Sequence, residues 1–292
     1  MGDRRDTISF LSDYGTADEF VGVVKSVVRS IAPHVTVIDL THEIPPHDVR
    51  AGGLALARAV QYLAPGVILA VVDPGVGTDR RAIAVEVAGG EGVFVGPDNG
   101  LLASAVAMAG GATRAVELSV VDHHLPSPGP TFAGRDIFAP VSALLCNGLP
   151  LEEVGHPVDP AGLLPGVLPI ARVEDGVLHA EVLWVDRYGN AQLNLDPDEL
   201  PEGDRLVLRI GGRPRTASRV HTYADVGPGQ VGLVVDSYGL VSVALDTASA
   251  GEQLGIGPGD AVLVEPAGDD GGGDPPPAPV RLTSGPRGSI RR

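Results

Sequence analysis

The first half of the chain alternates between two hydrophobic periods. Short apolar runs at residues 8–11, 35–40 and 67–73 are typical of buried β-strands, and further strands are expected at 82–87 and 93–95. In the segments between these runs, apolar residues recur every three or four positions, as on one face of a helix. Strands that alternate with helices predict an α/β domain with a largely parallel sheet, Rossmann-like in its layering.

The helices carry recognisable end signals. The first is expected to hold Asp18 and Glu19 in its first turn, where acidic side chains favour the helix dipole. Further helices are expected after Asp48, from Leu101, and from the Gly-Arg-Asp at 134–136 to the Asn-Gly pair at 147–148. Each helix is long enough to cover part of one sheet face.

The pattern changes near residue 155. Four prolines between residues 157 and 169 interrupt the periodicity, and short β-type runs separated by Gly, Pro and Asp follow. These runs predict a small β-barrel or sandwich. We therefore expect an N-terminal α/β domain at 1–165, an all-β domain at 166–267, and a low-complexity, disordered tail at 268–292.

Composition narrows the classes of function. The formal net charge of −16 argues against nucleic acid as a partner, because a polyanion would be repelled. The single cysteine, Cys146, excludes an intramolecular disulfide and is expected to be a buried structural thiol. No run has the apolar length of a membrane span and the first residues are polar, so we expect no membrane contact and a cytoplasmic location.

Polar side chains follow several of the predicted strands. Asp73 enters a Pro-Gly turn with Arg80 and Arg81 close behind, and Asp13, His47 and Asn99 stand at other strand or helix ends. Because ligands bind beyond the carboxyl ends of strands in open α/β sheets, we expect these groups to converge there. Taken singly, each also has a structural explanation as a helix cap, a turn or a surface residue.

The glycine pattern argues against a phosphate-dependent cofactor. Gly75 and Gly77 match neither a P-loop nor a dinucleotide-binding loop, so a nucleoside without a critical phosphate is favoured over ATP or NAD. A carboxylate at a strand end could hold the ribose hydroxyls. A metal site built on the His and acidic residues at 42–48 fits no standard ligand spacing, so we expect no metal and no cofactor.

Five ordered motifs carry a family resemblance. They are Ser-Asp-Tyr-Gly (12–15), Asp-Pro-Gly-Val-Gly (73–77), Gly-Pro-Asp-Asn-Gly-Leu-Leu (96–102), Thr-Phe-Ala-Gly-Arg-Asp (131–136) and Tyr-Gly-Asn (188–190). The chain, from about residue 7 to 265, resembles the S-adenosylmethionine hydroxide adenosyltransferases, relatives of fluorinating and chlorinating enzymes. The resemblance implies hydrolysis of S-adenosylmethionine (SAM) to adenosine and methionine, a C-terminal β-barrel, and a homotrimer with active sites between subunits.

The resemblance also implies the catalytic groups. Asp73 and Arg80 match two of three residues that handle the attacking water, and Ala133 occupies the position of the third, a histidine. Three interpretations stay open: a natural variant that uses Asp73 and Arg80 alone, a lineage with altered activity, or an engineered substitution. His123 and His124 lie upstream, where a solvated loop is the simpler role. If hydrolysis holds, Ala133→His is expected to raise the rate.

Implied substrate contacts come from both domains. Asp13 would bind the ribose diol, and Asn190 and Tyr223 would bind the adenine. Asp18, Asp186 and Ser237 would surround the amino-acid part of methionine. His47 would occupy a position at which halogenating relatives have an aromatic residue. The full set of implied substrate-binding residues is Asp13, Asp18, His47, Asn99, Asp186, Asn190, Tyr223 and Ser237. Asp236 stands where many relatives have asparagine.

Two other classes of function remain. A halogenase needs a halide pocket free of negative charge, and Asp73 would repel the anion; the long insertion of fluorinating enzymes before residue 96 is also missing. A non-catalytic SAM- or adenosine-binding protein stays open because of Ala133. Turnover of SAM distinguishes it from an enzyme.

Overall fold

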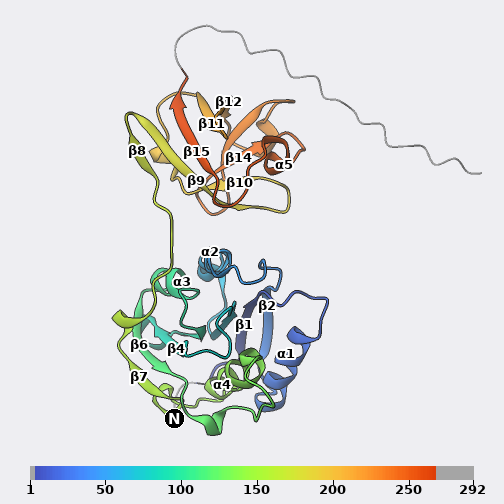
Figure 1. Ribbon diagram of the computed structural model, residues 1–292, viewed down its shortest axis with the longest axis vertical. Helices are drawn as coiled ribbons and strands as arrows, with labels where there is room; N and C mark the ends of the chain where they lie inside the picture. Colours follow the sequence, from blue (N-terminus) through green and yellow to red (C-terminus); the bar gives the residue numbers. More distant parts are fainter. Residues whose placement is uncertain (1–3, 268–292) are drawn as a thin grey trace, which may run out of the picture. The chain divides into compact units, whose positions relative to one another are not determined.

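The computed structural model describes residues 4–267 and divides into two compact units between Leu168 and Pro169 (Figure 1). The tail expected at 268–292 lies outside the described residues. Within the described part of the chain, none of the helices has the length and apolar character needed to cross a bilayer.

The first unit is built on a seven-stranded sheet in the order β2-β1-β3-β5-β4-β6-β7. The strands are β1 (Thr7–Ser12), β2 (Thr36–Thr41), β3 (Val67–Val71), β4 (Ala82–Val87), β5 (Gly92–Pro97), β6 (Ala112–Glu117) and β7 (His156–Val158). The neighbours β2, β1, β3 and β5 are parallel, whereas β4 runs against both β5 and β6 and β7 runs against β6. The mostly parallel sheet expected from the sequence is confirmed.

Helices cover both faces of this sheet. They are α1 (Phe20–Ile31), α2 (Val49–Ala59), α3 (Ala103–Met108), a π-helix η4 (Gly134–Phe138) and α4 (Ala139–Cys146). Alternate residues of β3 point to opposite faces: Val67, Leu69 and Val71 join the core under α1 and α4, and Ile68 and Ala70 join the core under α2 and α3. A strand buried on both faces explains its unbroken apolar run.

Two local expectations are tested by the helix ends. Asp18 and Glu19 precede α1 rather than lying in its first turn, because the chain from residue 13 to 19 forms bends before the helix begins at Phe20. Asp48 caps α2 as predicted, its side chain accepting a hydrogen bond from the backbone N–H of Ala51 at 2.8 Å.

Cys146 is fully buried at the end of α4, as expected of a structural thiol, and burial raises its pKa to about 12.

The second unit is a closed barrel. Its strands are β8 (Arg172–Glu174), β9 (Val177–Val185), β10 (Ala191–Leu193), β11 (Arg205–Ile210), β12 (Arg213–Arg219), β13 (Val231–Val235), β14 (Val241–Leu245) and β15 (Ala261–Pro266), with one helix, α5 (Ala250–Leu254). Pairing of β10 with both β14 and β9 closes a ring of strands to which β8 adds an outer partner. The predicted barrel is therefore confirmed.

Short 3₁₀ turns connect these elements. They are η1 (Val60–Tyr62), η2 (Ala88–Gly90), η3 (Val121–His123), η5 (Leu151–Glu153), η6 (Pro160–Gly162), η7 (Pro197–Glu199) and η8 (Tyr223–Asp225).

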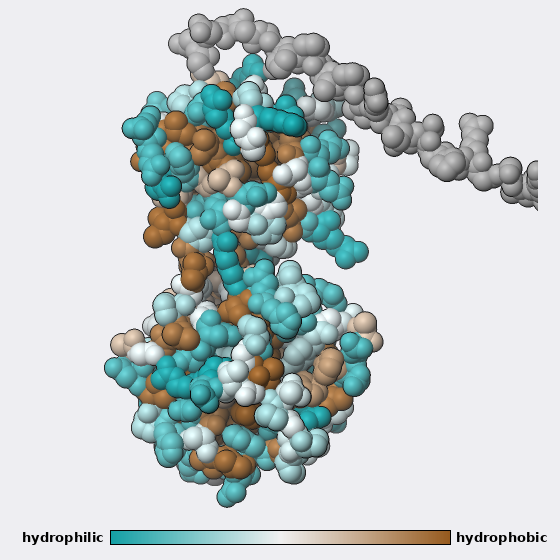
Figure 2. All heavy atoms as spheres, in the orientation of Figure 1, coloured by the Kyte–Doolittle hydropathy of each residue, from teal (hydrophilic) through white to brown (hydrophobic). Residues whose placement is uncertain are grey.

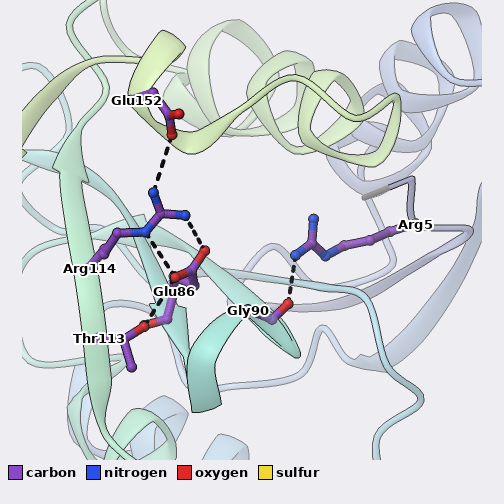
Figure 3. A network of polar contacts seen from close by, with 6 residues as sticks. All are labelled: Arg5, Glu86, Gly90, Thr113, Arg114 and Glu152. Carbon is purple, nitrogen blue, oxygen red and sulfur yellow. Dashed lines mark hydrogen bonds and ion pairs between the residues drawn. The ribbon is translucent and has the colours of Figure 1, made fainter. Parts of the chain in front are cut away.

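The surface mixes hydrophilic and apolar side chains over both units (Figure 2). Apolar side chains are exposed along the segment that joins the units, at Leu164, Val167, Leu168, Ile170 and Val173. On the sheet of the first unit, Arg114 of β6 donates two hydrogen bonds to Glu86 of β4, at 2.9 and 2.6 Å, and reaches Glu152 of η5 (Figure 3). Arg5, nearby, donates to the carbonyl of Gly90.

Candidate functional site

The centre of the first unit is a buried ion pair just beyond β3. Arg80 donates from Nε to Oδ1 of Asp73 at 2.8 Å and from Nη2 to Oδ2, so the guanidinium binds the carboxylate with two parallel hydrogen bonds. The side chains are only 14% and 5% exposed. Charge-assisted pairs of this geometry are strong and fix both groups in one orientation.

The loop that joins these two residues is held by its own turn and by a later segment. The hydroxyl of Thr78 donates to the carbonyl of Gly75 at 2.7 Å. Gly77 has a φ of +80°, and a Cβ there would lie 2.9 Å from the carbonyl oxygen of Pro130, so this position requires glycine. The ring of Phe138 packs against the guanidinium of Arg80, 5.3 Å from Cζ to the ring centre.

The neighbouring arginine has another function. Arg81 binds Asp98 through Nε at 2.9 Å and donates to the carbonyl of Gly162 at 2.7 Å. Asp98 also accepts from the backbone N–H of Leu164. These contacts hold the chain after β7 in place, so Arg80 is the arginine that faces Asp73.

The other strand-end residues lie in neighbouring loops at the same edge of the sheet. Asp13, after β1, accepts a hydrogen bond from the backbone N–H of His47 at 2.9 Å, and His47 has a φ of +70°. Asn99, after β5, donates to the carbonyl of Val72 at 2.9 Å, one residue before Asp73. Because β1, β3 and β5 are adjacent and parallel, their carboxyl ends bring these loops together.

Asp18 and Asn99 differ from the rest of the predicted set. Asp18 is exposed in the loop before α1 and forms no hydrogen bond or ion pair with Asp73 or Arg80. The side-chain oxygen of Asn99 accepts from the backbone N–H of Leu101 at 3.1 Å, so its amide connects two loops. Asn99 therefore positions the loop that carries Asp73.

Tyr14 and the segment around Ala133 complete this region. The ring of Tyr14 lies 5.6 Å from that of Phe132 and 6.4 Å from that of Phe10. Burial, followed by the negative charges of Asp13 and Asp73, raises the pKa of Tyr14 well above its ordinary value. Ala133 is 7% exposed and precedes the first residue of η4.

The residues proposed for a metal site have other partners. His42 is buried and hydrogen-bonded through Nδ1 to the hydroxyl of Ser12 at 2.8 Å, and Glu43 accepts from Thr16 at 3.0 Å. Asp48 caps α2. Among residues 4–267, the structure brings together no cluster of three His, Cys, Asp or Glu side chains suited to a metal.

The two upstream histidines lie in and beside η3. His123 forms a hydrogen bond from Nε2 to the carbonyl of Glu153 at 3.1 Å. Burial, and then the charge of His123, lowers the pKa of His124. Neither histidine forms a hydrogen bond or ion pair with Asp73 or Arg80.

The barrel contains a second cluster, in a pocket of about 270 Å³. The lining residues are Trp184, Asp186, Arg187, Tyr188, Asn190, Gln192, Tyr223, Asp236, Ser237, Tyr238 and Ser242. Four predicted residues, Asp186, Asn190, Tyr223 and Ser237, are thus brought together. Tyr223 is 44% exposed, and burial followed by the charges of Asp236 and Asp186 raises its pKa.

Two hairpin turns of the same construction flank this pocket. In each, an aspartate accepts from the N–H of a tyrosine two residues later at 2.8 Å: Asp186 from Tyr188, and Asp236 from Tyr238. The glycines that follow have φ values of +87° and +84°. The repeated Asp-x-Tyr-Gly at 186–189 and 236–239 was the available sequence signal for the residues our prediction missed, Tyr188 and Tyr238.

The carboxylate of Asp236 has specific partners. Oδ2 accepts from Gln192 at 2.6 Å and from the hydroxyl of Ser242 at 3.0 Å. Asp186 accepts in the same way from the side chain of Asn190 at 2.8 Å. These bonds hold Asn190 and Gln192 in fixed positions at the pocket.

Comparison with known proteins places both units in one family. A protein of Salinispora tropica named (R)-S-adenosyl-L-methionine hydrolase is 49% identical over 257 residues, 88% of this chain and 97% of that protein. A fluorinase of Actinopolyspora mzabensis is 30% identical over 291 residues, 89% of this chain and 97% of that protein.

A crystal structure of an uncharacterised conserved protein from Thermotoga maritima superposes with a TM-score of 0.81 at 35% identity, over 88% of this chain and 99% of that one. Residues 8–155 match the SAM hydroxide adenosyltransferase N-terminal domain, and residues 180–263 match the C-terminal domain of the same name. The chain therefore belongs to the SAM hydroxide adenosyltransferase family.

Proposed function

We propose that this protein hydrolyses SAM to adenosine and L-methionine. The observation that carries the proposal is the buried pair of Asp73 and Arg80 at the carboxyl end of β3, where ligands bind in open α/β sheets. The 49% identity with a protein named (R)-S-adenosyl-L-methionine hydrolase supports the same activity.

The reaction is a displacement at the 5′ carbon of the ribose. The oxygen of water forms a bond to that carbon while the bond from carbon to sulfur breaks, and its electron pair neutralises the sulfonium. Methionine leaves as a neutral thioether, so the leaving group needs no proton donor. The water loses one proton, which the carboxylate of Asp73 accepts through a hydrogen bond and passes to solvent.

Arg80 fixes the carboxylate that orients the water. Because both guanidinium hydrogen bonds go to Asp73, the carboxylate presents its remaining lone pairs in one direction. Orientation of a water in line with the breaking bond accounts for much of the expected acceleration. No residue in this step requires a metal or a cofactor, so treatment with a chelator should leave the rate unchanged.

The substrate would be held by the two described clusters. Asp13 would accept from the ribose hydroxyls, and Tyr223 and Asn190 would contact the adenine. Asp186 and Ser237 would bind the amino-acid part of methionine, for which a carboxylate and a hydroxyl suit the ammonium and carboxylate groups. The shared pocket of the last four residues supports this assignment.

The structure changes one argument against halide as the nucleophile. The carboxylate of Asp73 is neutralised by a bidentate arginine, so its repulsion of an anion is smaller than the sequence suggested. The preference for water rests instead on the comparisons, with 49% identity to a named hydrolase and 30% to a named fluorinase.

We also propose a homotrimer with active sites between neighbouring copies. Five apolar side chains between Leu164 and Val173 are at least half exposed, which supports an interface that covers them. Light scattering measures the number of copies. If sites are shared, mixing an Asp73→Ala chain with an Asn190→Ala chain restores part of the activity, because some sites in mixed trimers contain both native residues.

Product analysis tests the proposed activity. The protein is incubated with SAM, with and without chloride, and the nucleosides are separated by chromatography. Adenosine in both reactions supports hydrolysis, and 5′-chloro-adenosine formed only with chloride would indicate a halogenase. Tight SAM binding with no product at any pH would identify a binding protein and overturn our proposal.

A further inference from the structure

Tyr14 and Asp73 lie in the loops that follow two adjacent strands. Strands β1 and β3 are parallel and adjacent, and Ser12 pairs with Val71 at their carboxyl ends. Each follows its strand by two residues, so both lie in loops at the same edge of the sheet. The family resemblance assigned no function to this tyrosine.

The hydroxyl of Tyr14 points at the segment where the expected histidine is missing. A Cβ added to Gly134 would lie 2.1 Å from the Tyr14 hydroxyl oxygen and 3.1 Å from the ring carbon that bears it. The hydroxyl therefore lies over the α-carbon of Gly134, next to Ala133. The glycine at this position leaves room for the phenol.

The ring is fixed by aromatic neighbours on three sides. Phe10, Phe20 and Phe132 have ring centres 6.4, 5.7 and 5.6 Å from that of Tyr14. Phe10 and Phe132 pack edge-to-face against Tyr14 and Phe20 packs tilted, and together they restrict the ring to one orientation. The polar end of Tyr14 thus has a fixed position at the end of β1.

Several charged groups face the phenol from the surrounding elements. They are Asp13 on the same loop, Asp73 and Arg80 after β3, and Asp136 in η4. Burial and the three carboxylates favour the neutral phenol, while Arg80 acts in the opposite direction. Tyr14 therefore remains protonated and is able both to donate and to accept a hydrogen bond.

We propose that the Tyr14 hydroxyl is the third group, with Asp73 and Arg80, that contacts the attacking water. This inference rests on the proposed hydrolysis of SAM. The phenol oxygen accepts a hydrogen bond from the water. No proton is transferred to Tyr14; the proton that the water loses goes to Asp73, as in the reaction above.

Tyr14→Phe tests this role because it removes the hydroxyl and keeps the ring. We expect kcat for adenosine formation to fall by about tenfold or more, the loss of one oriented hydrogen bond to a reacting group. KM for SAM and the thermal unfolding temperature should remain unchanged. Tyr62→Phe is the matched control: Tyr62 is 73% exposed on η1, and its variant should behave as wild type.

The pH profile separates a contact with water from a titrating base. Because Tyr14 stays neutral, the ratio of wild-type to Tyr14→Phe kcat should be constant between about pH 6 and about pH 9, below the ordinary phenol pKa. A ratio that changes through this range would overturn the proposal. So would a wild-type kcat in Tyr14→Phe, or a loss of activity that only parallels a loss of thermal stability.

Histidine at position 133 provides a second test. If Tyr14 and an imidazole contact the same water, Ala133→His should raise kcat more in the Tyr14→Phe background than in wild type. Equal effects in the two backgrounds would contradict a shared function. Failure of the proposed hydrolysis is distinguishable, since the wild-type protein would then form no adenosine.

Discussion

The pair of Asp73 and Arg80 allows a quantitative prediction. Both side chains are almost fully buried and each satisfies the other through two hydrogen bonds. Asp73→Ala or Arg80→Ala alone leaves a buried charge without a partner, at a cost of about 3–5 kcal/mol in the free energy of unfolding. This corresponds to a fall of about 6–20 °C in unfolding temperature for a domain of this size.

The variant that carries both Asp73→Ala and Arg80→Ala should lose less unfolding free energy than the two single variants lose together. With both groups gone, no unpaired charge remains, so we expect its cost to be about that of one single substitution. All three variants should lose most of their hydrolytic activity, because the water then lacks its orienting carboxylate or the carboxylate lacks its support.

The choice of assay depends on which unit contains the tryptophan and which contains the longer helices. The only tryptophan in the sequence, Trp184, lies in β9 of the barrel, so its fluorescence reports on the barrel and not on the unit that contains Asp73 and Arg80. The longer helices belong to the first unit, so far-UV circular dichroism during urea unfolding is the appropriate measurement. Activity is followed by chromatography of adenosine.

A second bidentate pair in the same sheet is the control. Arg114 binds Glu86 with the same geometry, but its side chain is 54% exposed (Figure 3). Glu86→Ala leaves only the half-exposed guanidinium of Arg114 without a partner, so it should cost only about 0.2–1 kcal/mol and leave activity unchanged. Equal losses of unfolding free energy for the two pairs would refute the argument that burial decides how much an ion pair contributes to stability. Strictly additive losses for Asp73 and Arg80 would refute it too.

Three further predictions concern other parts of the molecule. The hydrogen bonds from Arg114 lower the pKa of Glu86 in the folded state, so the stabilisation from this carboxylate is complete above about pH 4.5 and is lost as the pH falls further; urea titrations of wild type and Glu86→Gln should converge in acid. Gly134→Ala should displace the Tyr14 hydroxyl and lower kcat, with little additional loss in a Tyr14→Phe background; additive losses would contradict this contact. Tyr223→Ala should raise KM for SAM by about tenfold or more through lost stacking, while Tyr223→Phe changes it little; an unchanged KM in the alanine variant would remove Tyr223 from the adenine site.

The sequence predicted elements best where one force dominates. The strand at β3 was evident because burial on both faces selects a continuous apolar run, and the cap of α2 was evident because Asp48 acts within three residues of the chain. In contrast, β12 reads Arg-Pro-Arg-Thr-Ala-Ser-Arg and gives no hydrophobic signal. Only one of its residues, Ala217, is buried, so its strand conformation depends on pairing with β11 and β13.

Asp73, Asp13 and Asn99 were predictable candidates because polar residues at strand ends follow from local pattern and topology. Sequence alone also established the two-domain organisation that the family resemblance implied. Only the tertiary structure showed that Arg80 satisfies Asp73 with both hydrogen bonds, that Arg81 is committed to Asp98, and that Tyr14 reaches Gly134. These contacts join residues from separate loops, and their geometry is decided by strand register and packing.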